Sequence, residues 1–241
     1  MKSFCLATLL SALTSIVFCA GCAHTTTVKT ETAPTPKTEA VEEATPQVLK
    51  PLVLAENERL LFDGASLAGW AICEENAFED HGPVTVQSGA IVMGKGRPMT
   101  GIAWTGDFPR NDYEVEMLAK RVEGSDFFCG MTFPVGEAYC TLILGGWGGS
   151  LVGLSNIDTY SAAENSTTRG ENFEQGRWYR VRLRVTDAAI QAWLDEEEII
   201  DQERAGHEFS IWWEQEPARP FGINTYYTVG ALKDMVLRPA R

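Results

Sequence analysis

From about residue 55 onward, apolar and polar side chains alternate in short runs separated by turn residues. The clearest run is 178–185, where Tyr179, two valines and a leucine alternate with Trp178 and three arginines. A period of two is typical of an antiparallel strand with one buried face. Comparable runs predict strands at 59–62, 84–87, 90–93, 113–119, 126–133, 139–144, 178–185, 189–194, 199–202 and 232–237. With turn signals between them and no helical stretch of any length, this pattern predicts an all-β sandwich or barrel.

The first 21 residues have the pattern of an export signal, with Lys2 before an apolar run that ends in small residues. The run is short for a membrane-spanning helix. Residues 19–22, Cys-Ala-Gly-Cys, resemble a bacterial lipobox, although Cys19 stands where leucine is usual. We expect cleavage before Cys22 and lipidation of that cysteine, which would anchor the chain to a membrane of the cell envelope, most simply the outer membrane. An ordinary signal peptide is the alternative.

Composition divides the rest of the chain in two. Residues 22–54 are rich in Pro and Thr without a strand or helix period, so they are predicted to be a disordered linker. Residues 55–241 can form one substantial core and are expected to be a single domain. The chain carries 20 Lys and Arg against 33 Asp and Glu, a net charge of −13. An acidic domain repels nucleic acid and anionic lipid, so its partners are expected to be neutral.

The predicted domain contains Cys73, Cys129 and Cys140, so at least one thiol is free. If Phe133 faces Tyr139 across a turn, Cys129 lies opposite residue 143 and points to the other face from Cys140. On that register the two cannot form a disulfide. From residue 55 onward the sequence has no CxxC motif or Cys/His cluster, and it predicts neither a metal site nor a cofactor.

Several segments occur in the order found in one known family. Residues 61–70, Leu-Phe-Asp-Gly-Ala-Ser-Leu-Ala-Gly-Trp, resemble the LFDGxSLxGW start of the 3-keto-disaccharide hydrolase domain, and residues 86–91, 111–116, 176–181 and 232–238 are similar to its later strands. The resemblance implies a concanavalin-like jelly roll, a β-sandwich of two antiparallel sheets with a concave sugar-binding face. It also implies cleavage of 3-keto-glycosides by elimination and hydration.

Two strands depart from the family pattern. Residues 128–133 and 139–144 lack the arginine and the acidic residues that typical members carry there. Elimination needs a base near the C2 proton, donors for the developing enolate and a proton for the leaving oxygen. Two functions therefore stay open for a carbohydrate partner. One is an envelope-anchored hydrolase or lyase of 3-keto-glycosides, and the other is a non-catalytic carbohydrate-binding or envelope-interaction module on the same fold.

Glu116 and His81 are the candidate catalytic residues. Glu114 and Glu116 share one face of a predicted strand, but Leu118 stands where retaining glycosidases of this fold carry a third acidic residue. Glu116 is predicted to be a base or a sugar ligand, with a solvated strand face as the alternative. His81 follows an acidic stretch in a loop and is either a base or a surface residue.

The candidate sugar-binding residues lie in two loops. Trp147 stands among four glycines, as an exposed platform for a sugar ring or as a buried side chain in a tight strand crossover. The loop 155–169 is dense in amides, hydroxyls and carboxylates, and recognition residues are often found on such loops. A plain surface loop is the alternative. The residues predicted to contact sugar there are Asn156, Asp158, Glu164, Asn165 and Arg169.

Overall fold

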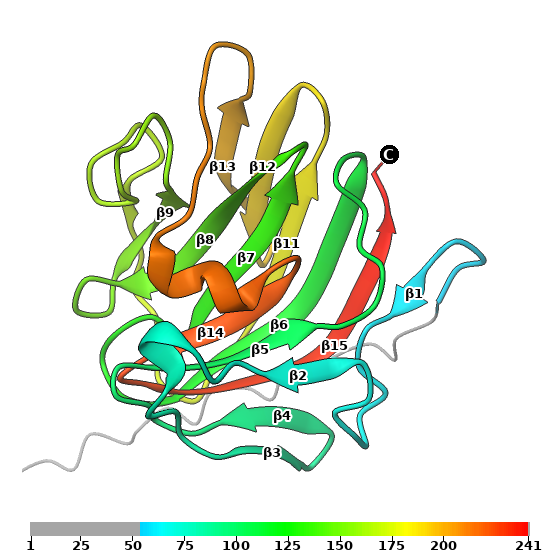
Figure 1. Ribbon diagram of the computed structural model, residues 1–241, viewed down its shortest axis with the longest axis vertical. Coiled ribbons are helices and arrows are strands. Elements are labelled where there is room, and N and C mark those ends of the chain that lie inside the picture. The colour runs from blue at the N-terminus through cyan, green and yellow to red at the C-terminus, as the bar shows by residue number, and fades with distance from the viewer. Residues whose placement is uncertain (1–53, 241) are drawn as a thin grey trace, which may run out of the picture. The chain divides into compact units, whose positions relative to one another are not determined.

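The structure is a computed structural model that describes residues 54–240 (Figure 1). In this range the chain forms two antiparallel sheets and two short 3-10 helices, η1 (Asn76–Phe78) and η2 (Trp213–Ala218). The predicted all-β sandwich is confirmed. The predicted export signal, Cys22 and the linker up to residue 53 lie outside the described residues. Neither described helix is long and apolar enough to cross a membrane.

Sheet A has eight strands, and one of its faces is open to solvent. The strand order is β13-β12-β11-β6-β15-β4-β3, and β1 pairs with β15. Buried and half-exposed residues alternate along β11 and β12, which is the pattern that predicted them. The strands are β1 (Arg59–Leu60), β3 (Val84–Gln87), β4 (Ala90–Met93), β6 (Tyr113–Glu123), β11 (Trp178–Val185), β12 (Ala189–Leu194), β13 (Glu197–Glu203) and β15 (Val229–Pro239).

Sheet B has seven strands in the order β10-β9-β8-β7-β14-β5-β2 and is largely buried on both faces. The alternation of apolar and polar residues did not predict β2, β5, β9, β10 and β14. In β5, β9 and β14, most residues on both sides of the strand are buried, so no alternation marks them. The strands are β2 (Trp70–Ile72), β5 (Met99–Trp104), β7 (Cys129–Val135), β8 (Ala138–Gly146), β9 (Leu151–Ser155), β10 (Arg169–Gly170) and β14 (Gly222–Tyr226).

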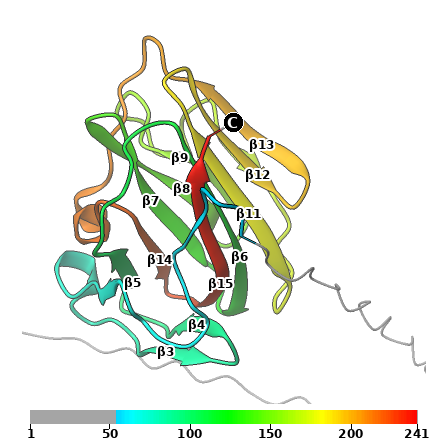
Figure 2. The same cartoon turned by 90° about the vertical axis from the view of Figure 1, so that its right-hand side faces the viewer.

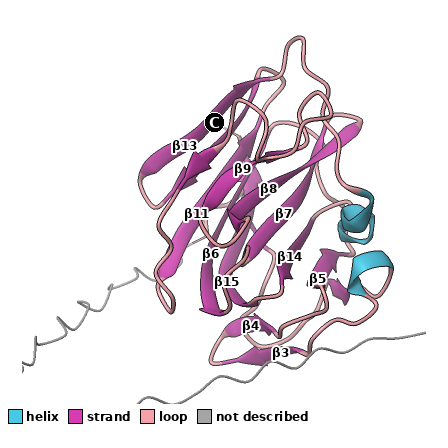
Figure 3. Cartoon of the chain, turned by 90° about the vertical axis from the view of Figure 1, so that its left-hand side faces the viewer, coloured by secondary structure: helices cyan, strands magenta, loops and turns pink. Residues whose placement is uncertain are grey.

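The main core lies between the two sheets, which Figure 2 shows as two layers. A second apolar cluster lies on the outer face of sheet B, where Phe78 of η1 and Ala218 of η2 join Met99, Phe127 and Ile143. Figure 3 shows both helices beside β14 and β5. The helices therefore cover the face of sheet B that points away from sheet A.

Cys129 and Cys140 both face the main core, which corrects the predicted register. Cys140 lies opposite Phe133, one position from the predicted pairing. The reason is a shorter turn: only residues 136–137 connect β7 and β8. A shift of one residue moves a side chain to the other face of the sheet. The two cysteines and Cys73 are free thiols.

Candidate functional site

Glu116 lies on the outer face of sheet A, within a network of ion pairs. Its Oε2 accepts a hydrogen bond from Arg238 Nη2 at 2.6 Å. The same guanidinium pairs with Glu114, which is only 5 % exposed and also accepts from Arg184 at 3.0 Å. Burial lowers the pKa of Arg238, but its hydrogen bonds to Glu114 and Glu116 outweigh this and raise it. Glu116 is thus tied to a fixed cation, and its role as a base stays a prediction.

His81 lies between η1 and β3, with Nδ1 2.8 Å from the backbone oxygen of Gly82. Strand β3 is at one edge of sheet A, and β15 and β4 separate it from β6, which carries Glu116. The structure therefore does not bring the two candidate catalytic residues together. His81 as a base also stays a prediction.

Asn156 and Asp158 hold the start of the β9–β10 loop. Asn156 is 5 % exposed, and its backbone N–H donates to the oxygen of Ser210 at 2.6 Å. Asp158 accepts a hydrogen bond from the backbone N–H of Glu208 at 2.8 Å, and its Oδ2 lies 2.7 Å from His207 Nδ1. The hydrogen bond from the backbone of Glu208 lowers the pKa of Asp158 most, and the hydrogen bond with His207 lowers it further. Both residues fasten the loop to residues 207–210.

Glu164, Asn165 and Arg169 have partners within the protein as well. Glu164 accepts from the Ser161 hydroxyl at 2.5 Å, and the Asn165 amide donates to the Ser161 oxygen at 2.8 Å. Arg169 pairs with Glu197 at 2.7 Å, which connects β10 to the start of β13. These contacts fold the loop onto itself and onto sheet A. Their binding of sugar stays a prediction.

Trp147 is 53 % exposed, at the tip of the turn between β8 and β9. Arg121, only 6 % exposed, holds this turn: its Nη2 donates to the oxygen of Gly149 at 2.7 Å and to that of Gly145 at 3.2 Å. The guanidinium also lies 5.2 Å from the ring centre of Phe128. Of the two alternatives for Trp147, the structure has the exposed side chain.

Four further exposed aromatic residues near sheet B were not predicted from the sequence. Among residues 54–240, the exposed aromatic side chains are Trp147, Tyr160, Trp212, Trp213 and Tyr227, and we call these five the aromatic rim. Trp147 and Tyr160 lie in loops that join strands of sheet B, and Tyr227 lies in the turn from β14 to β15 of sheet A. Trp212 and Trp213 lie in the segment that covers sheet B. The doublets at 212–213 and 226–227 were a usable signal, because consecutive side chains of an extended segment point to opposite sides.

Contacts on the outer face of sheet B connect Tyr227 to the turn that carries Trp147. The ring of Tyr227 lies edge-on to Tyr226, with centroids 4.9 Å apart, and Tyr226 packs against Phe127 at 5.5 Å. Asp126, the neighbour of Phe127, accepts a hydrogen bond at 3.3 Å from the turn that carries Trp147. At one end of sheet B, a chain of contacts therefore runs from Tyr227 through Tyr226, Phe127 and Asp126 to the turn with Trp147.

Gln215 fixes η2, and with it Trp213, to the middle of sheet B. Its Oε1 accepts hydrogen bonds from Thr132 at 2.8 Å, Thr141 at 3.0 Å and Asn224 at 3.3 Å. These four polar side chains are at most 5 % exposed, and none of them is charged. The strands that lack the charged residues of typical family members thus carry a neutral cluster under η2.

Glu214 and Tyr226 are titratable groups beside the rim. Glu214 Oε2 is buried and has no hydrogen-bond partner among the described residues. Burial raises the pKa of Tyr226, and the neighbouring Tyr227, Asp126 and Glu214 raise it further. The Glu214 carboxylate is thus one of the charged groups that act on the phenol of Tyr226. Among residues 54–240, no group of three or more His, Cys, Asp or Glu side chains is arranged to hold a metal ion.

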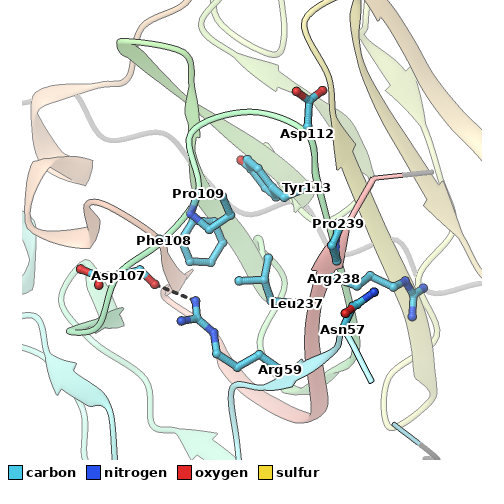
Figure 4. A pocket seen from close by; sticks show the side chains of 10 residues that line it. All are labelled: Asn57, Arg59, Asp107, Phe108, Pro109, Asp112, Tyr113, Leu237, Arg238 and Pro239. Atoms are coloured by element: carbon cyan, nitrogen blue, oxygen red, sulfur yellow. Dashed lines mark hydrogen bonds between the residues drawn. The ribbon is translucent and has the colours of Figure 1, made fainter. Parts of the chain in front are cut away.

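A pocket of about 470 Å³ opens elsewhere, between β1, the loop before β6 and the end of β15 (Figure 4). Phe108, Pro109 and Leu237 are among its apolar lining residues, and Asn57 and Arg59 are among its polar ones. None of the residues predicted to act in catalysis or sugar binding lines this pocket.

The sequence profile of the 3-keto-alpha-glucoside-1,2-lyase-like domain matches residues 57–229. The chain belongs to this family. The resemblance seen in the sequence is thereby confirmed, and family membership supports a carbohydrate-related function. A search of curated protein sequences found no match.

Solved structures similar to this family member share its fold. A Bacillus subtilis protein of unknown function with a galectin-like fold has a TM-score of 0.54 at 9 % identity, over 76 % of this chain and 96 % of its own. The Crh5 transglycosylase in complex with NAG has a TM-score of 0.52 at 13 % identity, over 78 % of this chain and 85 % of its own. A Parabacteroides distasonis protein provisionally assigned to the glycosyl hydrolases has a TM-score of 0.50 at 15 % identity, over 78 % of this chain and 99 % of its own.

Proposed function

We propose that this chain binds a neutral glycan on the aromatic rim. The observation that carries the proposal is that all five exposed aromatic side chains of residues 54–240 lie in turns and loops next to strands of sheet B or in the segment that covers it. Aromatic faces pack against the C–H faces of sugar rings, and the carboxylates of Asp126 and Glu214 can accept from hydroxyl groups. The net charge of −13 favours an uncharged ligand.

The spacing of the strands suggests the size of the ligand. Trp147 follows β8 and Tyr227 follows β14, and only β7 lies between these strands. Two strand spacings make about 10 Å, which is longer than one sugar ring. We therefore expect affinity to increase from a monosaccharide to a short oligosaccharide.

Isothermal titration of the full chain with cello-, laminari- and malto-oligosaccharides of increasing length tests this proposal. Trp147→Ala and Trp213→Ala are expected to weaken binding about tenfold each, as truncation of a central aromatic side chain does. Trp178→Ala is the matched control, because Trp178 lies on sheet A, where Lys120 and Lys233 contact its ring. Equal losses in all three variants would count against the rim as the binding surface.

A lyase acting on 3-keto-glycosides is the second candidate, and family membership together with Glu214 and Tyr226 favours it. In this proposal the Glu214 carboxylate takes the proton from C2 of the oxidised sugar. The electron pair forms the C1–C2 double bond as the C1–O bond breaks, and the phenol of Tyr226 protonates the leaving oxygen. Addition of water to the double bond then completes the hydrolysis.

Turnover of a chromogenic 3-keto-glucoside by the full chain tests the second candidate. Glu214→Gln is expected to lower kcat about a hundredfold while leaving affinity for the substrate in place. Tyr226→Phe is also expected to lower kcat. If the chain without substitutions binds the glycoside but shows no turnover above background, binding remains as the function.

We also propose that the chain is exported and lipid-anchored through Cys22 in the cell envelope. The support is the lipobox-like sequence 19–22 after an apolar run. Mass spectrometry of the chain from a bacterial membrane fraction is expected to show a diacylated Cys22 at the new N-terminus, and Cys22→Ser is expected to release the protein into the soluble fraction. An unmodified Cys22 in the membrane fraction would refute the anchor.

A further inference from the structure

We infer that the pocket in Figure 4 is a second binding site, which takes a sugar carrying a carboxylate, such as a uronate. The pocket shares no residue with the aromatic rim, so this site goes beyond the proposed function. Its volume of about 470 Å³ is within the range of small-molecule sites.

The guanidinium of Arg59 is the group that would recognise the carboxylate. It donates to the backbone oxygen of Asp107 at 2.6 Å and lies 5.7 Å from the ring centre of Trp104. In the part of the chain that the structure describes, Arg59 has no ion pair. Figure 4 shows the carboxylates of Asp107 and Asp112 pointing away from it. Its remaining N–H groups match the bidentate geometry of a carboxylate.

The other wall of the pocket is apolar, which suggests that the carboxylate of the ligand is attached to a ring. Phe108 lines the pocket and is fixed in place, because it stacks on Phe221 at 4.4 Å with an angle of 4° between the ring planes and lies edge-on to Tyr113 at 5.2 Å. A rigid aromatic face beside Leu237 suits the C–H face of a sugar ring. Asn57 adds an amide that can bond a hydroxyl group.

Local charge also permits an anion here, despite the acidic composition of the domain. Arg238 is the other cation that lines the pocket, and its charge is already shared with Glu58, Glu114 and Glu116. Asp107 and Asp112 also line the pocket, with their carboxylates pointing away from Arg59 (Figure 4). More distant acidic residues act only weakly on the pocket, because the Debye length is about 8 Å at physiological ionic strength. The unpaired charge of Arg59 therefore decides which ligand is favoured, and binding is expected to weaken as salt increases.

The test follows the Trp104 indole resonance in the full chain during titration with methyl glucuronide, methyl glucoside and acetate. We expect methyl glucuronide to shift the Trp104 signal, and to bind about tenfold more tightly than either of the other two probes. Arg59→Met is expected to remove that preference. Arg97→Met is the matched control, since Arg97 is also exposed, lies outside the pocket and has no ion pair with any residue of 54–240. Phe108→Leu keeps the wall apolar and is expected to weaken both sugars.

Equal binding of glucoside and glucuronide, or a preference that survives Arg59→Met in a chain with unchanged melting temperature, would overturn the inference. Acetate binding as tight as glucuronide would show an anion site without sugar recognition and overturn it as well. Binding of neutral oligosaccharides on the rim is read from Trp147 and Trp213 in the same spectra. Failure of one site is therefore distinguishable from failure of the other.

Discussion

Gln215 is the residue on which the geometry of the rim depends most. One buried oxygen receives three hydrogen bonds from three strands, β7, β8 and β14, and it fixes the helix that carries Trp213. Removing such an acceptor leaves buried donors without partners, which costs about 1–3 kcal/mol for each unsatisfied group.

We therefore expect Gln215→Leu to lower the free energy of unfolding by about 2–4 kcal/mol in urea titrations. Gln191→Leu is the matched control, because Gln191 is half-exposed and its amide bonds only to Glu198 at 3.0 Å. The control is expected to change stability by less than about 1 kcal/mol. Similar losses in the two variants would show that the cluster under η2 does not anchor the helix.

The buried cysteines give a pH-dependent prediction. Burial raises the pKa of Cys73 and of Cys140 from 9.0 to about 12, and it also raises that of Cys129. The folded state therefore keeps these thiols neutral where the unfolded state ionises. Their contribution to stability is complete below pH 9 and is lost as the pH rises from 9 towards 12.

In a chain whose Cys5, Cys19 and Cys22 are replaced by serine, a thiol reagent at pH 8 is expected to label none of the remaining cysteines until urea unfolds the protein. The free energy of unfolding is expected to decrease above pH 9, and to decrease less steeply in Cys73→Ala. Rapid labelling of the folded protein would contradict the burial of these thiols.

Residue patterns in the sequence predicted faces but not partners. Alternation placed Glu116 on a solvent face correctly, yet its partner Arg238 is 122 positions away and only the β6–β15 pairing brings them together. Asp158 and His207 likewise contact each other although they are 49 positions apart in the sequence. The functions of charged residues therefore depended on contacts that no local spacing encodes.

At the scale of elements, the sequence predicted sheet A far better than sheet B. Strands such as β11 have one solvated face, so their period of two is visible in the sequence. Strands β5, β9 and β14 are covered on both sides, and each contains a glycine. Asn224 of the cluster under η2 was therefore hidden on β14, whereas Thr132 and Thr141 lie on the predicted strands β7 and β8.

The glycine-rich turn before β9 gives a prediction at this scale. Gly145 and Gly148 both have positive φ, so alanine strains either position by about 1–2 kcal/mol. A Cβ at Gly145 would lie 2.2 Å from Arg121 Nη2, whereas one at Gly148 would meet nothing within 4 Å. Gly145→Ala must therefore also displace the guanidinium that holds the turn.

We expect Gly145→Ala to destabilise the protein by about 1–3 kcal/mol more than Gly148→Ala in urea unfolding, because Arg121 loses buried hydrogen bonds. Glycan affinity is expected to follow the same order, since Trp147 depends on the turn. Equal effects of the two substitutions would mean that Arg121 does not position this turn.

At the scale of the whole molecule, the family resemblance gave the fold, and the site required the structure. The seven tryptophans divide among different regions. Trp147, Trp212 and Trp213 belong to the rim, Trp178 and Trp193 lie on sheet A, and Trp70 and Trp104 lie on β2 and β5. This distribution follows from the topology of the strands and could not be predicted from the order of residues along the chain.

The most direct measurement of the central claim is an indole NMR titration of the full chain, which resolves one N–H signal for each tryptophan. With the oligosaccharide that binds most tightly in calorimetry, we predict shifts of Trp147, Trp212 and Trp213, while Trp178 and Trp193 keep their positions. Shifts confined to the tryptophans of sheet A would contradict the account, because they would place the glycan on the opposite face of the sandwich.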